Sequence, residues 1–268
     1  MNMYYEVHKS HPSHEWICFF HGLGGSHRMF TKQLDSLKQD YNLLLFDLPG
    51  HGASGSIDDY SHKELATTVL MLMNSLHIKK AHLLGISLGT IIMQEICYKA
   101  PERVLSVING GTAVEIKQWG YWLANIVFSP ISKVVIPYLW NYKALAYLFM
   151  PKQNHKRSRH FFIQEAKKMN REDYFKWCDF VVKTNARYRY IRSKIKSSIP
   201  QVHIMGAEDH MFLEGVVRNF RPENVRIIEK CGHVCNLERA KEFNKHMVKF
   251  LQDQKVNKAE RAKAVQMN

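Results

Sequence analysis

The sequence predicts an α/β fold in which helices flank a mostly parallel central sheet. Short apolar runs alternate along the chain with segments of helical periodicity, the order typical of strand–helix units. The runs are apolar throughout, which favours strands covered on both faces, as in a parallel sheet. With 268 residues, of which 46% are hydrophobic, the chain can bury one large core. The expected strands span residues 16–20, 43–46, 82–84, 104–108, 202–205 and 225–228.

Three apolar stripes predict helices that cover this sheet. Each stripe repeats its apolar residues every three or four positions, so that they share one face of a helix. Ser61 and Glu64 form a capping box before the first stripe, and Pro101 ends the second. The stripes are Leu65, Val69, Leu72 and Leu76; Leu88, Ile92 and Ile96; and Ala240, Phe243, Met247 and Phe250.

One long segment breaks the alternation and predicts a helical insertion. It shows no clear strand; residues 121–150 are apolar and aromatic, and residues 152–196 are strongly basic. A membrane-spanning helix is not expected, because a lysine and two prolines interrupt any run of about 20 apolar residues. The predicted parts are an α/β core over 1–113 and 199–251, the helical insertion over 114–198, and a polar, disordered tail over 252–268.

The charge of the chain is unevenly distributed. The net charge is +14, and residues 152–196 carry +10 of it. A local basic field attracts anions, which is compatible with an acidic substrate, a peripheral membrane contact or nucleic acid. A basic face that contacts only solvent explains the charge equally well. No nucleic-acid-binding motif accompanies the charge, so nucleic acid is not an expected partner.

The cysteines indicate a reducing compartment. Five widely scattered cysteines do not form a disulfide framework, and residues 1–10 lack the apolar run of a secretory signal. We therefore expect a cytoplasmic protein. Cys231 and Cys235 are expected to pack as small apolar residues. No Cys/His spacing matches a metal site, and we expect neither a metal nor another cofactor.

The strongest motif is Gly-Ile-Ser-Leu-Gly at residues 85–89. It follows the strand predicted at 82–84 and precedes the helix predicted to begin at Leu88, which is the context that a nucleophile elbow requires. The flanking glycines remove side chains that would clash in so sharp a turn. The hydroxyl of Ser87 would then lie exposed at the N-terminus of a helix, where negative charge is favoured. This context predicts Ser87 as a nucleophile.

A serine nucleophile needs a base and an acid that orients it. In α/β folds with this turn, the chain order is serine, then acid, then histidine. Glu208 and Asp209 follow the predicted strand at 202–205, and His233 follows the strand at 225–228. Both positions lie at the carboxyl ends of strands, where open α/β sheets place their sites. His233 is therefore the expected base, with Asp209 or Glu208 as the acid.

Acyl transfer also builds an oxyanion, which two N–H groups must stabilise. One expected donor is the backbone of Leu88, the residue after the nucleophile. The other is Leu23, in the glycine-rich loop at 21–25 that follows the first predicted strand. Glycines on both sides of Leu23 let the backbone approach a substrate oxygen closely.

Four motifs follow one another along the chain: His-Gly-Leu-Gly at 21–24, Asp-Leu-Pro-Gly-His-Gly-Ala-Ser at 47–54, the Ser87 turn, and Gly232 with His233. Together they resemble the α/β-hydrolase superfamily, in its branch of small carboxylesterase-like enzymes, in which the segment corresponding to 47–54 is a structural turn. The similarity covers residues 4–113 and 199–251.

The resemblance implies that Asp209 rather than Glu208 is the acid, and that the insertion takes the place of the family's cap domain over the pocket. The family core usually begins with one more strand, for which residues 3–7 would be a trimmed edge.

The expected function is hydrolysis of a carboxylic ester through an acyl-enzyme formed on Ser87. The aromatic half of the insertion suits an apolar pocket, and its basic half suits an anionic or amphiphilic small-molecule ester. A second hypothesis keeps Ser87, His233 and Asp209 but cleaves a C–C bond, lactone, thioester or amide, which fold and residues do not separate. A third hypothesis is a ligand-binding signalling protein on a hydrolase scaffold.

Overall fold

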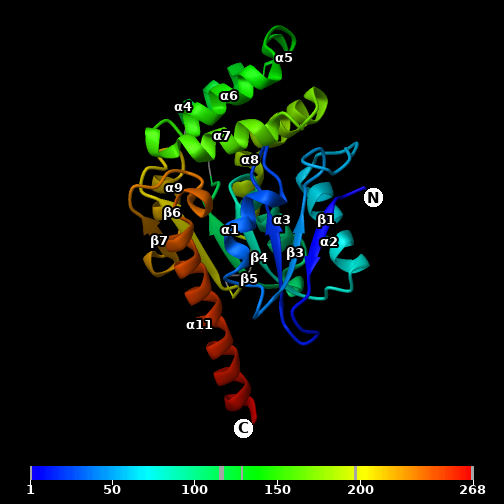
Figure 1. The fold of residues 1–268 in the computed structure, drawn as a ribbon, viewed down its shortest axis with the longest axis vertical. Helices are drawn as coiled ribbons and strands as arrows, with labels where there is room; N and C mark the ends of the chain where they lie inside the picture. Colours follow the sequence, from blue (N-terminus) through cyan, green and yellow to red (C-terminus); the bar gives the residue numbers. More distant parts are fainter. Residues whose placement is uncertain (1, 115–117, 128, 196–197, 267–268) are drawn as a thin grey trace.

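The computed structural model describes residues 2–114, 118–127, 129–195 and 198–266 of the chain. Its centre is a seven-stranded sheet with the order β1-β3-β2-β4-β5-β6-β7 (Figure 1). Only the edge strand β1 is antiparallel to its neighbour, and the six other strands run parallel. The strands are β1 (Tyr5–His8), β2 (Trp16–Phe20), β3 (Asn42–Phe46), β4 (Ala81–Ile86), β5 (Val104–Gly110), β6 (Gln201–Gly206) and β7 (Val225–Ile228).

The sheet confirms the predicted α/β class, and its six parallel strands lie on the six predicted apolar runs. Every residue of β3 and β4 is buried, as expected for strands covered on both faces. The additional first strand is present as β1, which pairs with β3 at the edge of the sheet. It is four residues long and none of its residues is buried, so it lacks the continuous apolar run that marked the others.

Helices pack on this sheet in two groups. The first is α2 (His62–Ser75) with α3 (Leu88–Lys99), and α3 lies against β2, β4 and β5. The second is α1 (Thr31–Leu34), α10 (Cys235–Glu238) and α11 (Ala240–Gln266), which contact one another near β6 and β7. The predicted N-cap is present at the start of α2, where Ser61 Oγ accepts a hydrogen bond from the Glu64 amide at 3.2 Å.

The structure differs from the sequence prediction at the C-terminus. A disordered tail was expected over 252–268, but α11 continues as a helix to Gln266. Within residues 240–266 the chain has no proline or glycine and is rich in lysine and alanine, which are good helix formers. An ion pair one turn apart, between Lys249 and Asp253, adds to the stability of the helix.

The described residues of the insertion form five α-helices. These helices lie at one end of the molecule, whereas α11 extends away from the other end (Figure 1). No helix among the described residues is long and apolar enough to cross a membrane. One further helix, α9 (Leu213–Asn219), lies beside β6. The helices of the insertion are α4 (Gln118–Val127), α5 (Pro130–Val135), α6 (Tyr138–Phe149), α7 (Lys156–Ala166) and α8 (Arg171–Ile191).

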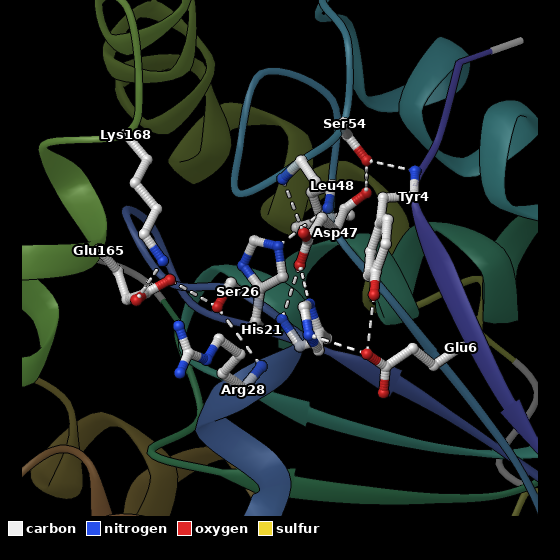
Figure 2. A network of polar contacts seen from close by, with 12 residues as sticks. Tyr4, Glu6, His21, Ser26, Arg28, Asp47, Leu48, Ser54, Glu165 and Lys168 are labelled. Atoms are coloured by element: carbon white, nitrogen blue, oxygen red, sulfur yellow. Dashed lines mark hydrogen bonds and ion pairs between the residues drawn. The ribbon is translucent and has the colours of Figure 1, made fainter.

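Buried polar contacts fasten the insertion to the loops of the core. Ser26, in the loop after β2, donates to the buried Glu165 of α7 at 2.7 Å (Figure 2). The hydroxyl of Tyr142 on α6 donates to the Leu23 carbonyl at 2.9 Å. Because these contacts join distant parts of the chain, the position of the insertion depends on the loop geometry of the core.

Asp47 organises the loops that receive the insertion (Figure 2). Its fully buried carboxylate accepts hydrogen bonds from the His27 amide at 2.7 Å, the His27 ring at 2.8 Å and the Ala53 amide at 2.9 Å. Its carbonyl accepts from Ser54 Oγ, which in turn accepts from the Tyr4 amide. Burial alone would raise the pKa of the Asp47 carboxyl, but the hydrogen bonds lower it to about 2.

Asp47 should therefore make the stability of the fold depend on pH in the acid range. A carboxyl with a pKa of about 2 when folded and 3.8 when unfolded stabilises the fold by about 2 kcal/mol above pH 4. This contribution is lost as the pH falls toward 2. We expect Asp47→Asn to lower the free energy of unfolding by about 2 kcal/mol at pH 7 and to weaken the fall between pH 4 and pH 2.

Urea unfolding followed by circular dichroism at pH 7, 4 and 3 measures this effect. The matched control is Asp40→Asn, which removes an exposed carboxylate and should leave the unfolding midpoint close to that of the wild type. Equal midpoints for Asp47→Asn and the wild type at pH 7 would contradict the role assigned to Asp47.

Candidate active site

Ser87 occupies a strained turn between β4 and α3. Its φ of +52° lies in the left-handed region, which residues with a side chain rarely adopt. The helix begins immediately afterwards and packs closely on β2. A Cβ atom on Gly89 would lie 2.1 Å from the Phe20 carbonyl oxygen, so only glycine permits this approach. The turn thus presents the Ser87 side chain beyond the carboxyl ends of the strands.

The structure brings Ser87, His233 and Asp209 into one hydrogen-bonded chain. Ser87 Oγ lies 2.7 Å from His233 Nε2, and His233 Nδ1 lies 2.7 Å from Asp209 Oδ2. Because an ionised carboxylate only accepts hydrogen bonds, the proton of the neutral imidazole belongs on Nδ1. Nε2 is then free to accept the hydroxyl proton of Ser87.

The backbone holds the Asp209 carboxylate in place. Asp209 follows β6 and is 1% exposed. Its Oδ1 accepts hydrogen bonds from the amides of Met211 and Phe212, at 3.2 and 3.1 Å. Its Oδ2 remains directed at His233. Two oxygens with separate partners fix the rotamer of the carboxylate and therefore the plane of the histidine ring.

Glu208, the competing acid in the sequence, contacts the insertion instead of His233. Its carboxylate accepts hydrogen bonds from Asn154 Nδ2 at 2.9 Å and His155 Nε2 at 2.8 Å, and Lys152 Nζ lies at 2.9 Å. The hydrogen bonds from Asn154 and Lys152 lower the pKa of the Glu208 carboxyl to about 2. The two adjacent acids therefore have different partners.

His155 was not singled out in the sequence, yet it makes a polar contact between the insertion and the core. Its side chain is fully buried, between Glu208 at 2.8 Å and Glu238 at 3.7 Å. Glu238 also accepts a hydrogen bond from the amide of Gly232, directly before His233, at 2.5 Å. His155 is one of fifteen histidines and lies within a basic segment, so no local pattern distinguished it.

The two predicted oxyanion donors, Leu23 and Leu88, come from two different segments of the core, the loop after β2 and the first residue of α3. Leu23 and Leu88 both line the cavity that contains Ser87. Within the described part of the chain, neither amide has an acceptor, whereas the neighbouring Gly24 and Gly25 amides donate to His51 and to the Gly22 carbonyl. An amide at the first turn of a helix lacks an intrahelical acceptor, which is the situation of Leu88.

A largely apolar cavity of about 130 Å³ opens beside Ser87 and His233. The core contributes Ile91 and Phe212, and the insertion contributes Leu145 and Phe149. The Phe149 ring stacks on the His233 ring, with centroids 5.2 Å apart. No lysine or arginine of the described residues lines the cavity, and the basic half of the insertion contributes only the uncharged Phe162, Val181 and Thr184 to its wall.

Among the described residues, no three histidine, cysteine, aspartate or glutamate side chains cluster in a way that could hold a metal ion. Cys231 and Cys235 are both buried and free, as expected for small apolar residues in the core. Burial raises the pKa of both thiols, so neither is a reactive thiolate at neutral pH.

The chain is similar in sequence to several curated proteins. The dihydrolipoyllysine-residue acetyltransferase component of the acetoin cleaving system of Pseudomonas putida is 26% identical over 88% of this chain. A putative carbamate hydrolase of Pseudomonas savastanoi is 33% identical over 40% of the chain. The matches span 63% and 42% of these relatives, so the chain covers about half the length of the curated proteins that it resembles.

The enol-lactonase of Burkholderia xenovorans LB400 has the same fold, with a TM-score of 0.76 and 22% sequence identity. The superposition covers 93% of this chain and 96% of the enol-lactonase. A family model described as the alpha/beta hydrolase fold matches residues 15–240. Since this match includes most of the sheet, the Ser87 turn and His233, the protein belongs to the α/β-hydrolase fold family.

Proposed function

We propose that the protein is a serine hydrolase that cleaves a small carboxylic ester through an acyl-enzyme intermediate. The observation that carries this proposal is the hydrogen-bonded chain from Ser87 through His233 to Asp209, at the wall of an apolar cavity. Residues 114–198 then act as the cap that closes the cavity over the nucleophile. The cavity positions an acyl or alcohol group, and the three side chains perform proton transfer and attack.

In the first half of the reaction, Ser87 Oγ attacks the ester carbonyl carbon while His233 Nε2 takes the hydroxyl proton. The carbonyl oxygen becomes an oxyanion, and the amides of Leu23 and Leu88 donate hydrogen bonds to it. Asp209 stabilises the imidazolium and keeps its ring oriented. The C–O bond of the ester then breaks, and the alcohol leaves with the proton held by His233.

In the second half, water replaces the alcohol. His233 takes a proton from the water as its oxygen attacks the acyl-enzyme carbonyl. The bond to Ser87 Oγ breaks, the proton returns to Ser87, and the carboxylic acid leaves. The net reaction consumes one ester and one water and yields one alcohol and one acid. The aromatic rings of Phe149 and Phe212 shield His233 from bulk water, which strengthens the electrostatic interactions in the site.

The shape and chemistry of the cavity define the substrate that we propose. Its volume of about 130 Å³ is close to that of an engineered cavity of about 150 Å³ that holds benzene, so a short acyl chain or a single ring fits. The apolar wall favours an uncharged group inside it. An anionic group on an amphiphilic ester would lie outside the cavity, where the basic half of the insertion is exposed to solvent.

A lactone is the second candidate substrate, because one of the solved structures with the same fold is an enol-lactonase. A lactone is an internal ester, and its opening follows the same steps without release of a separate alcohol. A carbamate is a further variant, favoured by the name of one relative. A ligand-binding signalling protein on this scaffold would show no multiple turnover.

The five free cysteines support a reducing compartment, and we propose a cytoplasmic location.

Substitution of the nucleophile gives the most direct test. Ser87→Ala should abolish covalent labelling by a fluorophosphonate and reduce ester hydrolysis to background, because no other group can form the acyl-enzyme. Intact-mass spectrometry measures the labelling, and circular dichroism checks the fold. Ser75→Ala, at an exposed position at the end of α2, is the matched control and should still be labelled. Labelling that persists in Ser87→Ala would identify a different nucleophile.

The adjacent acids provide a second test. Asp209→Asn should lower kcat by about 10⁴-fold, because an amide at this position favours the wrong tautomer of His233. Glu208→Gln should retain most of the activity, since Glu208 has no contact with His233 and holds His155 instead. Steady-state kinetics with a nitrophenyl ester, together with urea unfolding of both variants, separates catalysis from stability. A larger loss of kcat in Glu208→Gln than in Asp209→Asn would show that Glu208, and not Asp209, orients His233.

A series of nitrophenyl esters tests the size of the cavity. The acetate and butyrate should have kcat/KM values at least about tenfold above the decanoate, because a long chain exceeds the enclosed volume. Leu145→Ala enlarges the cavity and should shift the preferred acyl length toward longer chains. Esters of equal length with and without a carboxylate measure the role of charge at low salt. A flat profile in the wild type would show that the cavity does not select the acyl group.

A further inference from the structure

The outer surface of the insertion is unusually apolar. Among the described residues, the six most exposed large hydrophobic side chains all lie between residues 122 and 140, with exposed fractions of 64–79%. They come from α4, α5 and the first turn of α6. We call this group the outer apolar face: Trp122, Ile126, Ile131, Val134, Val135 and Trp140.

The same helices have two apolar sides. On the inner side, Val127 of α4 and Leu145 of α6 line the catalytic cavity. On the outer side, Trp122 and Ile126 of α4 lie one helical turn apart and face solvent, as does Trp140 at the start of α6. A soluble monomer rarely exposes so many large apolar side chains together, and such a patch marks a binding surface.

The outer apolar face projects from the molecule. Helix α5 is the outermost element at the end of the molecule opposite to the C-terminus (Figure 1). Hydrogen bonds to the Val127 carbonyl from Ser132 at 2.6 Å and Asn141 at 3.0 Å hold the three helices together there. Exposed apolar side chains at a projecting end of a protein can insert into the interface of a lipid bilayer.

Positive charge accompanies this face. Residues 118–171 contain nine lysines and arginines but a single acidic residue, Glu165. Glu165 is buried and bonded to Ser26 and Lys168, so it contributes little negative charge to the surface. Lys143 of α6 and Lys167, directly after α7, are exposed, whereas Lys133 of α5 forms an ion pair with Asp179 of α8 at 2.6 Å. A second copy of the chain would bring a face of the same sign against this one, which disfavours a dimer.

We propose that the outer apolar face docks the protein on the surface of an anionic phospholipid bilayer. Tryptophan is favoured at the level of the lipid headgroups, and isoleucine and valine are favoured below it. Lysines around the face attract the anionic headgroups. The attachment is peripheral, since α4 and α5 have 10 and 6 residues and a spanning helix needs about 20. This inference is independent of the proposed chemistry at Ser87.

Vesicle flotation with the full-length protein tests the proposal. The wild type should float with phosphatidylglycerol vesicles at low salt and bind phosphatidylcholine vesicles far more weakly. The double variant Ile131→Ser, Val134→Ser should lose affinity by about tenfold or more, because two apolar side chains no longer enter the layer. The matched control is Val217→Ser, Val256→Ser, which removes two exposed valines outside the insertion and should bind like the wild type.

Two further readouts define the mode of binding. Lys143→Gln and Lys167→Gln should each weaken binding by about fivefold at low salt and by less at high salt. Trp122 and Trp140 should produce a blue shift of the fluorescence on vesicle binding, which Trp122→Gln, Trp140→Gln should remove. Circular dichroism and hydrolysis of a soluble nitrophenyl ester should be unchanged in the Ile131→Ser, Val134→Ser variant, which shows that the core is intact.

Three results would overturn the proposal. The first is wild-type protein that does not float with anionic vesicles, or an Ile131→Ser, Val134→Ser variant that floats equally well. The second is a dimer in sedimentation velocity that this variant dissociates, without vesicle binding, which would assign the face to a second copy. The third is binding of soluble polyglutamate as tight as that of vesicles and lost in the same variant, which would assign it to an acidic polypeptide. Each result is independent of whether Ser87 is labelled by a fluorophosphonate.

Discussion

The close approach of α3 to β2 is the constraint on which the rest of the site depends. Because the residue at position 89 has no side chain, the helix packs against the Phe20 carbonyl, and the turn before it is forced into a positive φ at Ser87. This strained turn directs the hydroxyl to the edge of the sheet, where the loops after β6 and β7 bring Asp209 and His233. A parallel sheet supplies all three positions at one edge, so the geometry of the backbone precedes the chemistry.

The second determinant is the way in which the insertion is fastened to the core. Its contacts are buried and polar: Glu165 accepts from Ser26, and His155 reaches Glu208 beside the catalytic loop. A buried polar group costs free energy when it is left without a partner, so these pairs specify one position of the insertion rather than many. That position sets the wall of the cavity, because Phe149 of the insertion stacks on His233.

The insertion therefore has two surfaces of different character. Its inner surface completes an enclosed apolar cavity that suits a small uncharged group. Its outer surface combines exposed tryptophan and aliphatic side chains with a strong excess of positive charge. The basic residues that first suggested an anionic substrate do not line the cavity. Their charge fits the proposed docking of the insertion on an anionic bilayer, and this explanation does not depend on the substrate that enters the site.

The sequence by itself determined the α/β class, the six apolar parallel strands and the turn around Ser87, because these depend on local periodicity and on glycines at fixed spacing. It also placed His233 and two candidate acids at the ends of strands. The pattern alone left both acids open and the family resemblance favoured Asp209; the tertiary structure shows His233 bonded to Asp209, whereas Glu208 contacts His155. The contact of His155 and the exposure of the outer apolar face were decided by packing between segments distant in sequence, which no local pattern records.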